Sequence, residues 1–302
     1  MYLLDLTKQD LKDLVLAGKI AHLTLDKLEK HVKPGVSIGK LYDLAVNLIC
    51  QSEGVDLAFP PNISINECAA HDTAAPNDNR VIPRDFATVK LDIGVNVNGL
   101  LSDTARTFST DRKHAKLIKS ANVALKNVID IIKPGIRLNE IGAIVEDTIE
   151  GFGFKPIANL TGHQLERNNL HAGLSIPSVK SAHFGKRSEI KKGMLLAIEP
   201  FSTNGTAGYI VNSGIPLIYS LNRKPKSDIG SIVAERYQKL PFSLRSATFL
   251  LEKQGKKVDN LAEILDKDNF HTYSPLVEKS KGMVAQAEHT VFVTSNGAKI
   301  IT

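Results

Sequence analysis

Two aspartates, Asp92 and Asp103, have residue types and a spacing that could support metal-dependent chemistry. Residues 89–97 alternate between apolar and polar side chains and are followed by Asn98-Gly99, a pattern that predicts a β-hairpin closed by a type I′ turn. Pairing across this turn puts both aspartates on the polar face as diagonal neighbours, roughly 7–8 Å apart at Cα. Buried carboxylates repel each other unless a cation or a shared proton compensates. With small residues such as Gly94 leaving open space beside them, we interpret the hairpin as half of a metal site.

Three later residues, His163, Glu199 and Glu288, could complete that site. Glu199 ends the apolar run 194–198 and Glu288 precedes the run 291–293, and acids that adjoin core strands need partners. Each residue alone also has a structural explanation, such as a loop hydrogen bond or a surface ion pair. Together, four carboxylates and one imidazole suit divalent Mn, Fe, Co or Zn, and bridging carboxylates suit a two-metal site.

The composition is that of an ordinary soluble protein of 302 residues, 42% hydrophobic and 23% charged. Its formal net charge of +6 is compatible with a surface for nucleic acid or ribosomes, but the scatter of the lysines favours a general solvated surface. We expect neither a signal peptide nor a membrane span. Cys50 and Cys68 have no zinc or CxxC spacing, so we expect two buried free thiols in a reducing, cytosolic setting.

Helical periodicity predicts a helix over residues 7–31, capped by Thr7, and a second helix that begins after Ser37. Residues 59–85 are rich in Pro, Asn and Asp, which predicts an irregular segment with short strands at best. The hairpin follows this segment, and a helix over residues 111–131 follows the hairpin.

The order of elements then recurs about 100 residues later. Residues 132–138 (IKPGIRL) mirror residues 32–38 (VKPGVSI), and further strands are predicted near 194–199 and 284–293. Two copies are too few for a solenoid, so we predict an internally duplicated α+β domain with a pseudo-two-fold. Residues 222–270 lose the alternating pattern and take helical spacing, which indicates an inserted helical subdomain.

The ordered set of candidate ligands resembles that of the methionine aminopeptidases and their pita-bread, creatinase-like relatives. The segments KLDIGVNVNGLLSDTART, TGHQLERNNLHAG, GMLLAIEPF and AEHTVFV carry this resemblance, which covers essentially the whole chain. It implies a pita-bread fold in which an antiparallel sheet is flanked by helices, with residues 1–302 forming one catalytic domain. The insertion at 222–270 resembles type II methionine aminopeptidases, and the absence of an N-terminal extension resembles their archaeal branch.

The resemblance implies a role for each ligand. Asp92 would chelate one metal ion, His163 and Glu199 would hold the second, and Asp103 and Glu288 would bridge the pair. The ions would activate a water molecule as the nucleophile and polarise the scissile carbonyl. Glu199 would also pass a proton to the leaving amine.

The resemblance also implies substrate contacts. His71, at the end of FPPNISINECAAH, takes the position of a substrate-contacting histidine, and His171 would be a second hydrogen-bond donor to the peptide. Phe59, Leu170 and Tyr273 would line the pocket for the methionine side chain, although ordinary core packing also explains them. The free α-amine of the substrate would bind a metal ion, and a small second residue would be favoured.

The implied function is removal of the N-terminal methionine from nascent proteins and peptides, with two divalent ions (Co, Mn, Fe or Zn). We expect a cytoplasmic, monomeric enzyme, with transient ribosome contact left open. An Xaa-Pro dipeptidase or aminopeptidase P has the same ligands but usually carries a preceding domain, for which the position of Asp92 leaves no room. A non-catalytic relative that binds nucleic acid or ribosomes would have lost ligands that this chain retains. His114, His183 and His289 receive no role from the resemblance.

Overall fold

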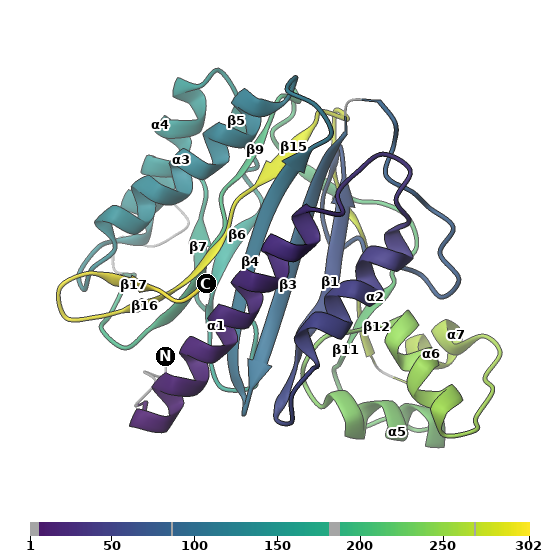
Figure 1. Ribbon diagram of the computed structural model, residues 1–302. Coiled ribbons are helices and arrows are strands. Elements are labelled where there is room, and N and C mark those ends of the chain that lie inside the picture. Colours follow the sequence, from purple (N-terminus) through teal and green to yellow (C-terminus); the bar gives the residue numbers. More distant parts are fainter. Residues whose placement is uncertain (1–5, 86, 181–187, 269) are drawn as a thin grey trace.

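The computed structural model describes residues 6–85, 87–180, 188–268 and 270–302 (Figure 1). The helices in these ranges are α1 (Lys8–Glu29), α2 (Ile38–Ile49), α3 (Ala115–Ile131), α4 (Leu138–Gly151), α5 (Asp228–Tyr237), α6 (Leu244–Lys253) and α7 (Leu261–Lys267). None of them is both long enough and apolar enough to cross a membrane.

The strands are short apart from three in the first half of the chain. They are β1 (Val55–Ile65), β2 (Cys68–Ala70), β3 (Thr88–Val97), β4 (Leu100–Ser109), β5 (Lys155–Pro156), β6 (Thr161–Leu165), β7 (Ser175–Pro177), β8 (Leu195–Ile198), β9 (Phe201–Thr203), β10 (Ile210–Asn212), β11 (Ile218–Leu221), β12 (Phe242–Ser243), β13 (Phe270–Tyr273), β14 (Leu276–Glu278), β15 (Val284–Gln286), β16 (His289–Val293) and β17 (Ala298–Ile300).

The first half is an antiparallel sheet ordered β1-β3-β4, with α1 and α2 lying across one face (Figure 1). Strands β3 and β4 form the predicted hairpin in the predicted register, because Asp92 pairs with Ala105 and Asp103 pairs with Gly94. The turn residues Asn98-Gly99 have φ values of 52° and 87°, as a type I′ turn requires. The apolar residues of β3 pack with α1 and α2 into one core cluster, so the two aspartates occupy the opposite face of the sheet.

The first two helices begin at the predicted caps. The Thr7 hydroxyl accepts the N–H of Asp10 at 3.1 Å, and the Asp10 carboxylate accepts the N–H of Thr7 at 3.0 Å. Ser37 caps α2 by accepting the N–H of Lys40 at 3.4 Å. These side chains satisfy N–H groups that lack partners within the helix, and such a cap is worth about 1 kcal/mol.

The second half contains a sheet ordered β17-β16-β8-β6-β7, which packs against α3 and α4 (Figure 1). Strand β8 is buried on both faces. Leu196 and Ile198 pack with the two helices, whereas Leu195 and Ala197 pack with residues of the first half. Burial on both sides explains why this strand reads as a continuous apolar run in the sequence.

Equivalent hydrogen bonds in the two halves confirm the predicted duplication. The N–H of Gly35 donates to the carbonyl of Ile82 at 2.8 Å, and the N–H of Gly135 donates to the carbonyl of Ile190 at 2.9 Å. The two glycines have φ values of 81° and 92°, a region that glycine enters without a steric penalty. Each Lys-Pro-Gly joint therefore turns the chain between two helices and anchors it in the same way.

The prediction of an irregular segment over residues 59–85 is wrong at its start. Residues Val55–Ile65 form strand β1, which pairs with β3 through register shifts between Leu57 and Asn62. Pro60-Pro61 lacks backbone N–H groups and disturbs the alternating pattern, which hides the strand in the sequence. An edge strand with bulges tolerates such prolines because it needs no ladder bond on its open side.

The two cysteines differ in their environment. Cys68 is buried in β2, as predicted, whereas Cys50 is exposed, so the prediction for Cys50 is wrong. Helix α2 ends at Ile49, its last buried residue, and Cys50 follows one position further round, beyond the apolar stripe. Its Sγ lies 3.8 Å from Oδ1 of Asp56.

Helices α5, α6 and α7 gather to one side of the molecule (Figure 1, green). They have an apolar cluster of their own, built around Tyr219, Val233, Phe242 and Leu251. Strands β11 and β13, which flank these helices in the chain, pair with each other. The chain therefore leaves the body of the protein and returns to it at the same place.

Candidate metal centre

Four carboxylates and one histidine meet where the two halves face each other. Asp92 and Asp103 come from the hairpin, His163 from β6, Glu199 from the end of β8 and Glu288 from the junction of β15 and β16. One ligand atom each of Asp103, His163 and Glu288 lies within 4.8 Å of the others. Nε2 of His163 is 3.4 Å from Oδ2 of Asp103 and 3.7 Å from Oε1 of Glu199. The structure therefore brings the predicted metal ligands together.

Hydrogen bonds between β4 and the segment around Glu288 hold the halves in register at this point. The N–H of Glu288 donates to the carbonyl of Ala105 at 2.9 Å, and the Thr104 hydroxyl donates to the carbonyl of Glu288 at 2.8 Å. The Thr290 hydroxyl accepts the N–H of Asp103 and donates to its carbonyl, both at 2.7 Å. Because these bonds involve the backbone of Asp103 and Glu288 directly, the spacing of the two carboxylates is set by the sheet.

Burial dominates the electrostatics of the cluster. It raises the pKa of Asp92, Glu199 and Glu288 well above the usual range, and the neighbouring carboxylates add to this effect. It also raises the pKa of Asp103 to about 7 and lowers the pKa of His163 to about 4. Buried acids that lack a compensating cation resist ionisation, and a bound divalent ion reverses this balance.

The donor set fits divalent metal ions. Oδ1 of Asp92 and Oδ1 of Asp103 are buried without a hydrogen-bond partner, which is costly for an acceptor unless another group binds it. Carboxylate oxygens with a minority of imidazole nitrogen are suitable ligands for Mn, Fe, Co and Zn. The cluster could therefore hold such ions and would be relieved of its charge repulsion by them.

The five candidate ligands line a cavity of about 310 Å³. Two further histidines, His71 and His171, line it as well. The ring of His171 is 4.5 Å from that of His163, and the ring of His71 meets Tyr273 edge-on at 5.4 Å. Burial lowers the pKa of His71 to about 4 and the pKa of His171 to about 3, so both rings are neutral at pH 7 and can each donate one N–H. His71 has a φ of 62°, a left-handed conformation that is uncommon for non-glycine residues but that histidine adopts more often than most.

An apolar wall closes one side of this cavity. The residues predicted for the side-chain pocket, Phe59, Leu170 and Tyr273, all line it. Phe201 and Ile218 line it as well, and sequence analysis misses both. Phe201 comes two residues after Glu199, so its position in the chain offered a signal, whereas Ile218 reaches the cavity only through the fold.

The open space predicted beside Gly94 is occupied by the ring of Phe59. A Cβ atom on Gly94 would lie 2.3 Å from Cε1 of that ring, and Phe59 is the pairing partner of Gly94 between β1 and β3. The prediction of free space is therefore wrong. The glycine instead lets an aromatic wall lie directly against the hairpin, next to the two aspartates.

Gln286 is a further site residue that sequence analysis misses. Its side chain is 1% exposed and lies among the carboxylates. A signal for it does exist in the sequence, because residues 286 and 288 in an extended segment point to the same face. A buried glutamine two residues before a candidate ligand is therefore expected to face the same site as that ligand.

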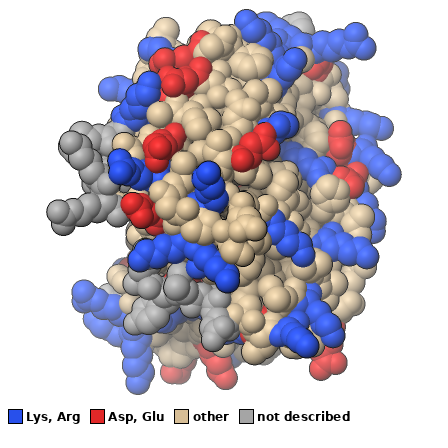
Figure 2. All heavy atoms as spheres, turned by 90° about the vertical axis from the view of Figure 1, so that its left-hand side faces the viewer, with Lys and Arg blue, Asp and Glu red and all other residues tan. Residues whose placement is uncertain are grey.

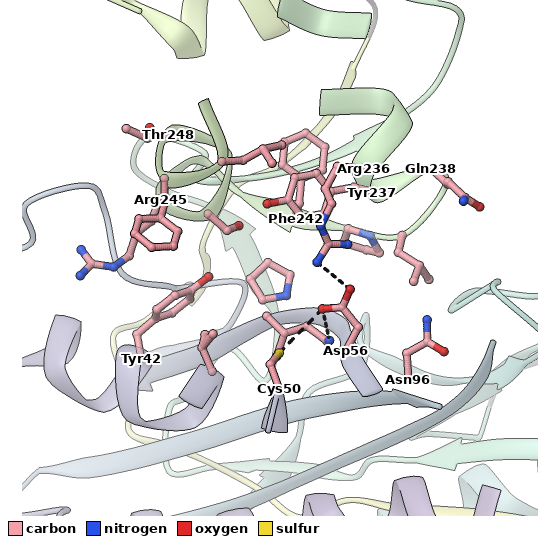
Figure 3. Close-up of a pocket in the computed structure, with 18 of the residues that line it drawn as sticks. Tyr42, Cys50, Asp56, Asn96, Arg236, Tyr237, Gln238, Phe242, Arg245 and Thr248 are labelled. Atoms are coloured by element: carbon pink, nitrogen blue, oxygen red, sulfur yellow. Dashed lines mark hydrogen bonds and ion pairs between the residues drawn. The ribbon is translucent and has the colours of Figure 1, made fainter. Parts of the chain in front are cut away.

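A second and larger cavity, of about 1300 Å³, lies between α2, β1 and the helices α5 and α6 (Figure 3). None of the candidate metal ligands lines it, although Pro60 and Pro241 line both cavities. Its Asp56 pairs with Arg236 at 2.6 Å, as the dashed line in Figure 3 shows. The larger cavity thus lacks the acidic cluster, and two of its acids, Asp43 and Asp56, are paired with arginines. The smaller cavity is therefore the candidate reaction site.

Comparison with known proteins agrees with this geometry. Residues 13–295 match metallopeptidase family M24. The chain belongs to this family. It is 39% identical to a methionine aminopeptidase of Thermococcus onnurineus, over 96% of this chain and 98% of that one. It is 36% identical to a methionine aminopeptidase of Methanocaldococcus jannaschii, over 95% and 96% of the two chains.

Solved structures show the same fold. The structure of a methionine aminopeptidase from Thermotoga maritima superposes with a TM-score of 0.72 at 23% identity and covers 100% of this chain and 99% of that chain. The predicted pita-bread fold and membership of a metallopeptidase family are therefore confirmed. His183, to which no role was given, lies outside the described residues.

Proposed function

We propose that this M24 protein is a type II methionine aminopeptidase that removes the N-terminal methionine from nascent proteins and peptides. The observation that carries the proposal is the acidic cluster with His163 at the end of a small cavity with an apolar wall. A metal-binding end and an apolar end suit a substrate whose first residue has a free amine and an apolar side chain.

In this proposal the ligands divide between two ions. Asp92 would hold one ion, His163 and Glu199 would hold the other, and Asp103 and Glu288 would be shared by both. When bound, divalent ions of this kind supply an activated water and polarise a carbonyl. Co, Mn, Fe and Zn are the candidates, since a site rich in carboxylates accepts several of them.

The remaining polar residues act on the peptide itself. Neutral His71 and His171 donate hydrogen bonds to the peptide group that is attacked, which stabilises the negative charge that develops there. Glu199 takes up the proton released at the nucleophile and passes it to the departing amine. Both roles need these side chains close to the scissile bond, and all three line the same cavity.

The apolar wall selects the first residue. Phe59, Leu170 and Tyr273 receive the methionine side chain. Binding of the free α-amine by a metal ion would limit cleavage to the first residue. The resemblance to methionine aminopeptidases also favours a small second residue, since a larger side chain would clash.

We further propose that the chain forms one catalytic domain into which residues 222–270 are inserted as a helical subdomain, as expected of type II. Their separate apolar cluster and the pairing of β11 with β13 support this division.

We propose a cytoplasmic monomer that meets its substrates as nascent chains, with transient ribosome contact. On the face shown in Figure 2, Lys and Arg side chains are spread out with acidic side chains between them. This mixture offers no support for a tight nucleic-acid complex, which needs a concentrated basic surface.

The test is a peptide-hydrolysis assay across a panel of Co, Mn, Fe and Zn. We expect release of methionine from a Met-Ala-Ser peptide and no cleavage of Ala-Pro peptides. Cleavage of Ala-Pro but not of Met-Ala-Ser would assign the protein to the Xaa-Pro peptidases instead. Failure to cleave either peptide with any metal, by a protein that stays folded, would favour a non-catalytic binding role.

A further inference from the structure

One buried polar side chain at the centre of the site, that of Gln286, has no task in the chemistry proposed above. Its Nε2 atom points at three carboxylates at once, with distances of 3.4 Å to Oδ2 of Asp92, 3.5 Å to Oε2 of Glu199 and 3.4 Å to Oε2 of Glu288. These three residues come from both halves of the fold and are assigned to both metal ions. The amide is therefore a common neighbour of three of the five candidate ligands.

The contacts divide the oxygens of these carboxylates into two kinds. On Asp92, Oδ2 faces the amide while Oδ1 has no hydrogen-bond partner. On Glu199, Oε2 faces the amide while Oε1 lies 3.7 Å from Nε2 of His163, another candidate ligand. On both carboxylates one oxygen thus faces Gln286, while the other either has no hydrogen-bond partner or lies near another candidate ligand.

A neutral amide is well suited to this task. An arginine or lysine in the same place would compete with metal ions for the carboxylates, whereas a glutamine offers N–H donors and adds no charge. The backbone of Gln286 is itself fixed, because the Thr107 hydroxyl accepts a hydrogen bond from the backbone N–H of Gln286 and donates one to its backbone carbonyl, both at 2.7 Å. This places the amide on rigid backbone that belongs to the junction of the two halves.

We infer that Gln286 is a positioning residue, which orients Asp92, Glu199 and Glu288 for metal binding before the ions arrive. The inference rests on the metal site proposed above. Hydrogen-bond partners of metal ligands typically contribute 10–100-fold to metal affinity, and an amide shared by three ligands belongs in this range.

The test is Gln286→Met, which keeps the length of the side chain and removes the N–H donors. Co(II) affinity is measured by titration calorimetry and ligand geometry by the visible absorption of bound Co(II). We expect Kd to rise at least 10-fold and the absorption bands to shift. Gln286→Asn retains an amide but withdraws it by one methylene, and we expect the same defect in it. This variant replaces Gln286→Met in the test if Gln286→Met fails to fold.

The matched control is Thr203→Val, which removes another buried hydroxyl, one that bonds the backbone of Met283 and Gly205, and leaves both Gln286 and its Thr107 support in place. We expect a lower melting temperature with a Kd within threefold of wild type and unchanged absorption bands. Wild-type Kd and bands in folded Gln286→Met and Gln286→Asn would overturn the inference, as would an equal change in Thr203→Val. Absence of Co(II) binding by the wild-type protein would instead overturn the metal site itself.

Discussion

The two halves of this fold share a plan but supply their ligands in different ways. In the first half, Asp92 and Asp103 lie on strands joined by a tight turn, so one short segment carries both. In the second half, His163, Glu199 and Glu288 come from segments that become neighbours only because β8 lies between β6 and β16. The first contribution is local and the second depends on the whole topology. A metal centre between the two halves can therefore form only when the halves are correctly assembled.

Removal of one proposed bridging carboxylate from each half should cause the greatest loss of activity. We expect Asp103→Asn and Glu288→Gln each to lower kcat/KM for Met-Ala-Ser on the order of 10³-fold, because each change removes a ligand shared by both ions. Circular dichroism should remain unchanged, since each variant removes one charge from a crowded buried cluster. Wild-type turnover by either variant would remove that residue from the site.

The histidines allow a second comparison, with a smaller expected effect. His71→Ala and His171→Ala should each lower kcat roughly 100-fold, through loss of a donor to the developing negative charge. His271→Ala is the matched control, because the His271 ring also contacts Tyr273, at 4.6 Å, but does not line the cavity. An equal loss in His271→Ala would mean that the effect comes from disturbing Tyr273.

Each half also has a glycine beside a ligand, and the two should respond differently to a methyl group. A Cβ on Gly162 would lie 2.4 Å from the backbone oxygen of Ala197, whereas a Cβ on Gly94 would meet the ring of Phe59 at 2.3 Å. Backbone cannot move aside easily, so Gly162→Ala should lower the free energy of unfolding by about 1–3 kcal/mol. In Gly94→Ala the ring of Phe59 and also Cβ of Ala58, at 2.8 Å, would have to shift, so we expect a raised KM together with a smaller loss of stability than in Gly162→Ala. Urea unfolding measures the loss of stability and steady-state kinetics measure KM. A raised KM in Gly162→Ala with an unchanged KM in Gly94→Ala would contradict the proposed pocket.

Glu278 should have a smaller effect, on the stability of the fold at low pH. It lies on β14, which pairs with β2 of the first half and β10 of the second. Burial alone would raise the pKa of Glu278, but N–H donors of Gly282, Ser280 and Gly208 and the Ser280 hydroxyl outweigh it and lower that pKa. An acid with a lowered pKa stabilises the fold above its unfolded-state pKa, and this stabilisation is lost as the pH falls through the folded-state value.

Wild-type protein should therefore lose more stability between pH 5 and pH 3 than Glu278→Gln does. Thermal unfolding at several pH values measures the difference between the two proteins. A difference that stays constant down to pH 3 would show that the charge of Glu278 contributes nothing.

The same contrast explains what could be predicted from the sequence. The hairpin, the helix caps at Thr7 and Ser37 and the duplicated Lys-Pro-Gly joints are local features, and the structure contains all of them. The five ligands could be assembled only with the help of a family resemblance, because strand order in the second half is not encoded in any short segment.

The features that could not be predicted from the sequence depend on the fold and not on a local pattern. Strand β1 is hidden by Pro60-Pro61, which only an edge position makes acceptable. The ring of Phe59 fills the space beside Gly94 because of a register shift in β1, and no alternation pattern reveals such a shift. Gln286 could have been found, since it shares a strand face with Glu288, but a buried amide draws less attention than a charge.

The central claim is that both halves contribute ligands to one two-metal centre. Anomalous diffraction from crystals of the Co(II)-loaded protein tests it most directly. We expect two anomalous peaks in the small cavity, one at Asp92 and the other at His163 and Glu199, with Asp103 and Glu288 contacting both. A single peak contacted by ligands of one half alone, or strong peaks only outside this cavity, would contradict it.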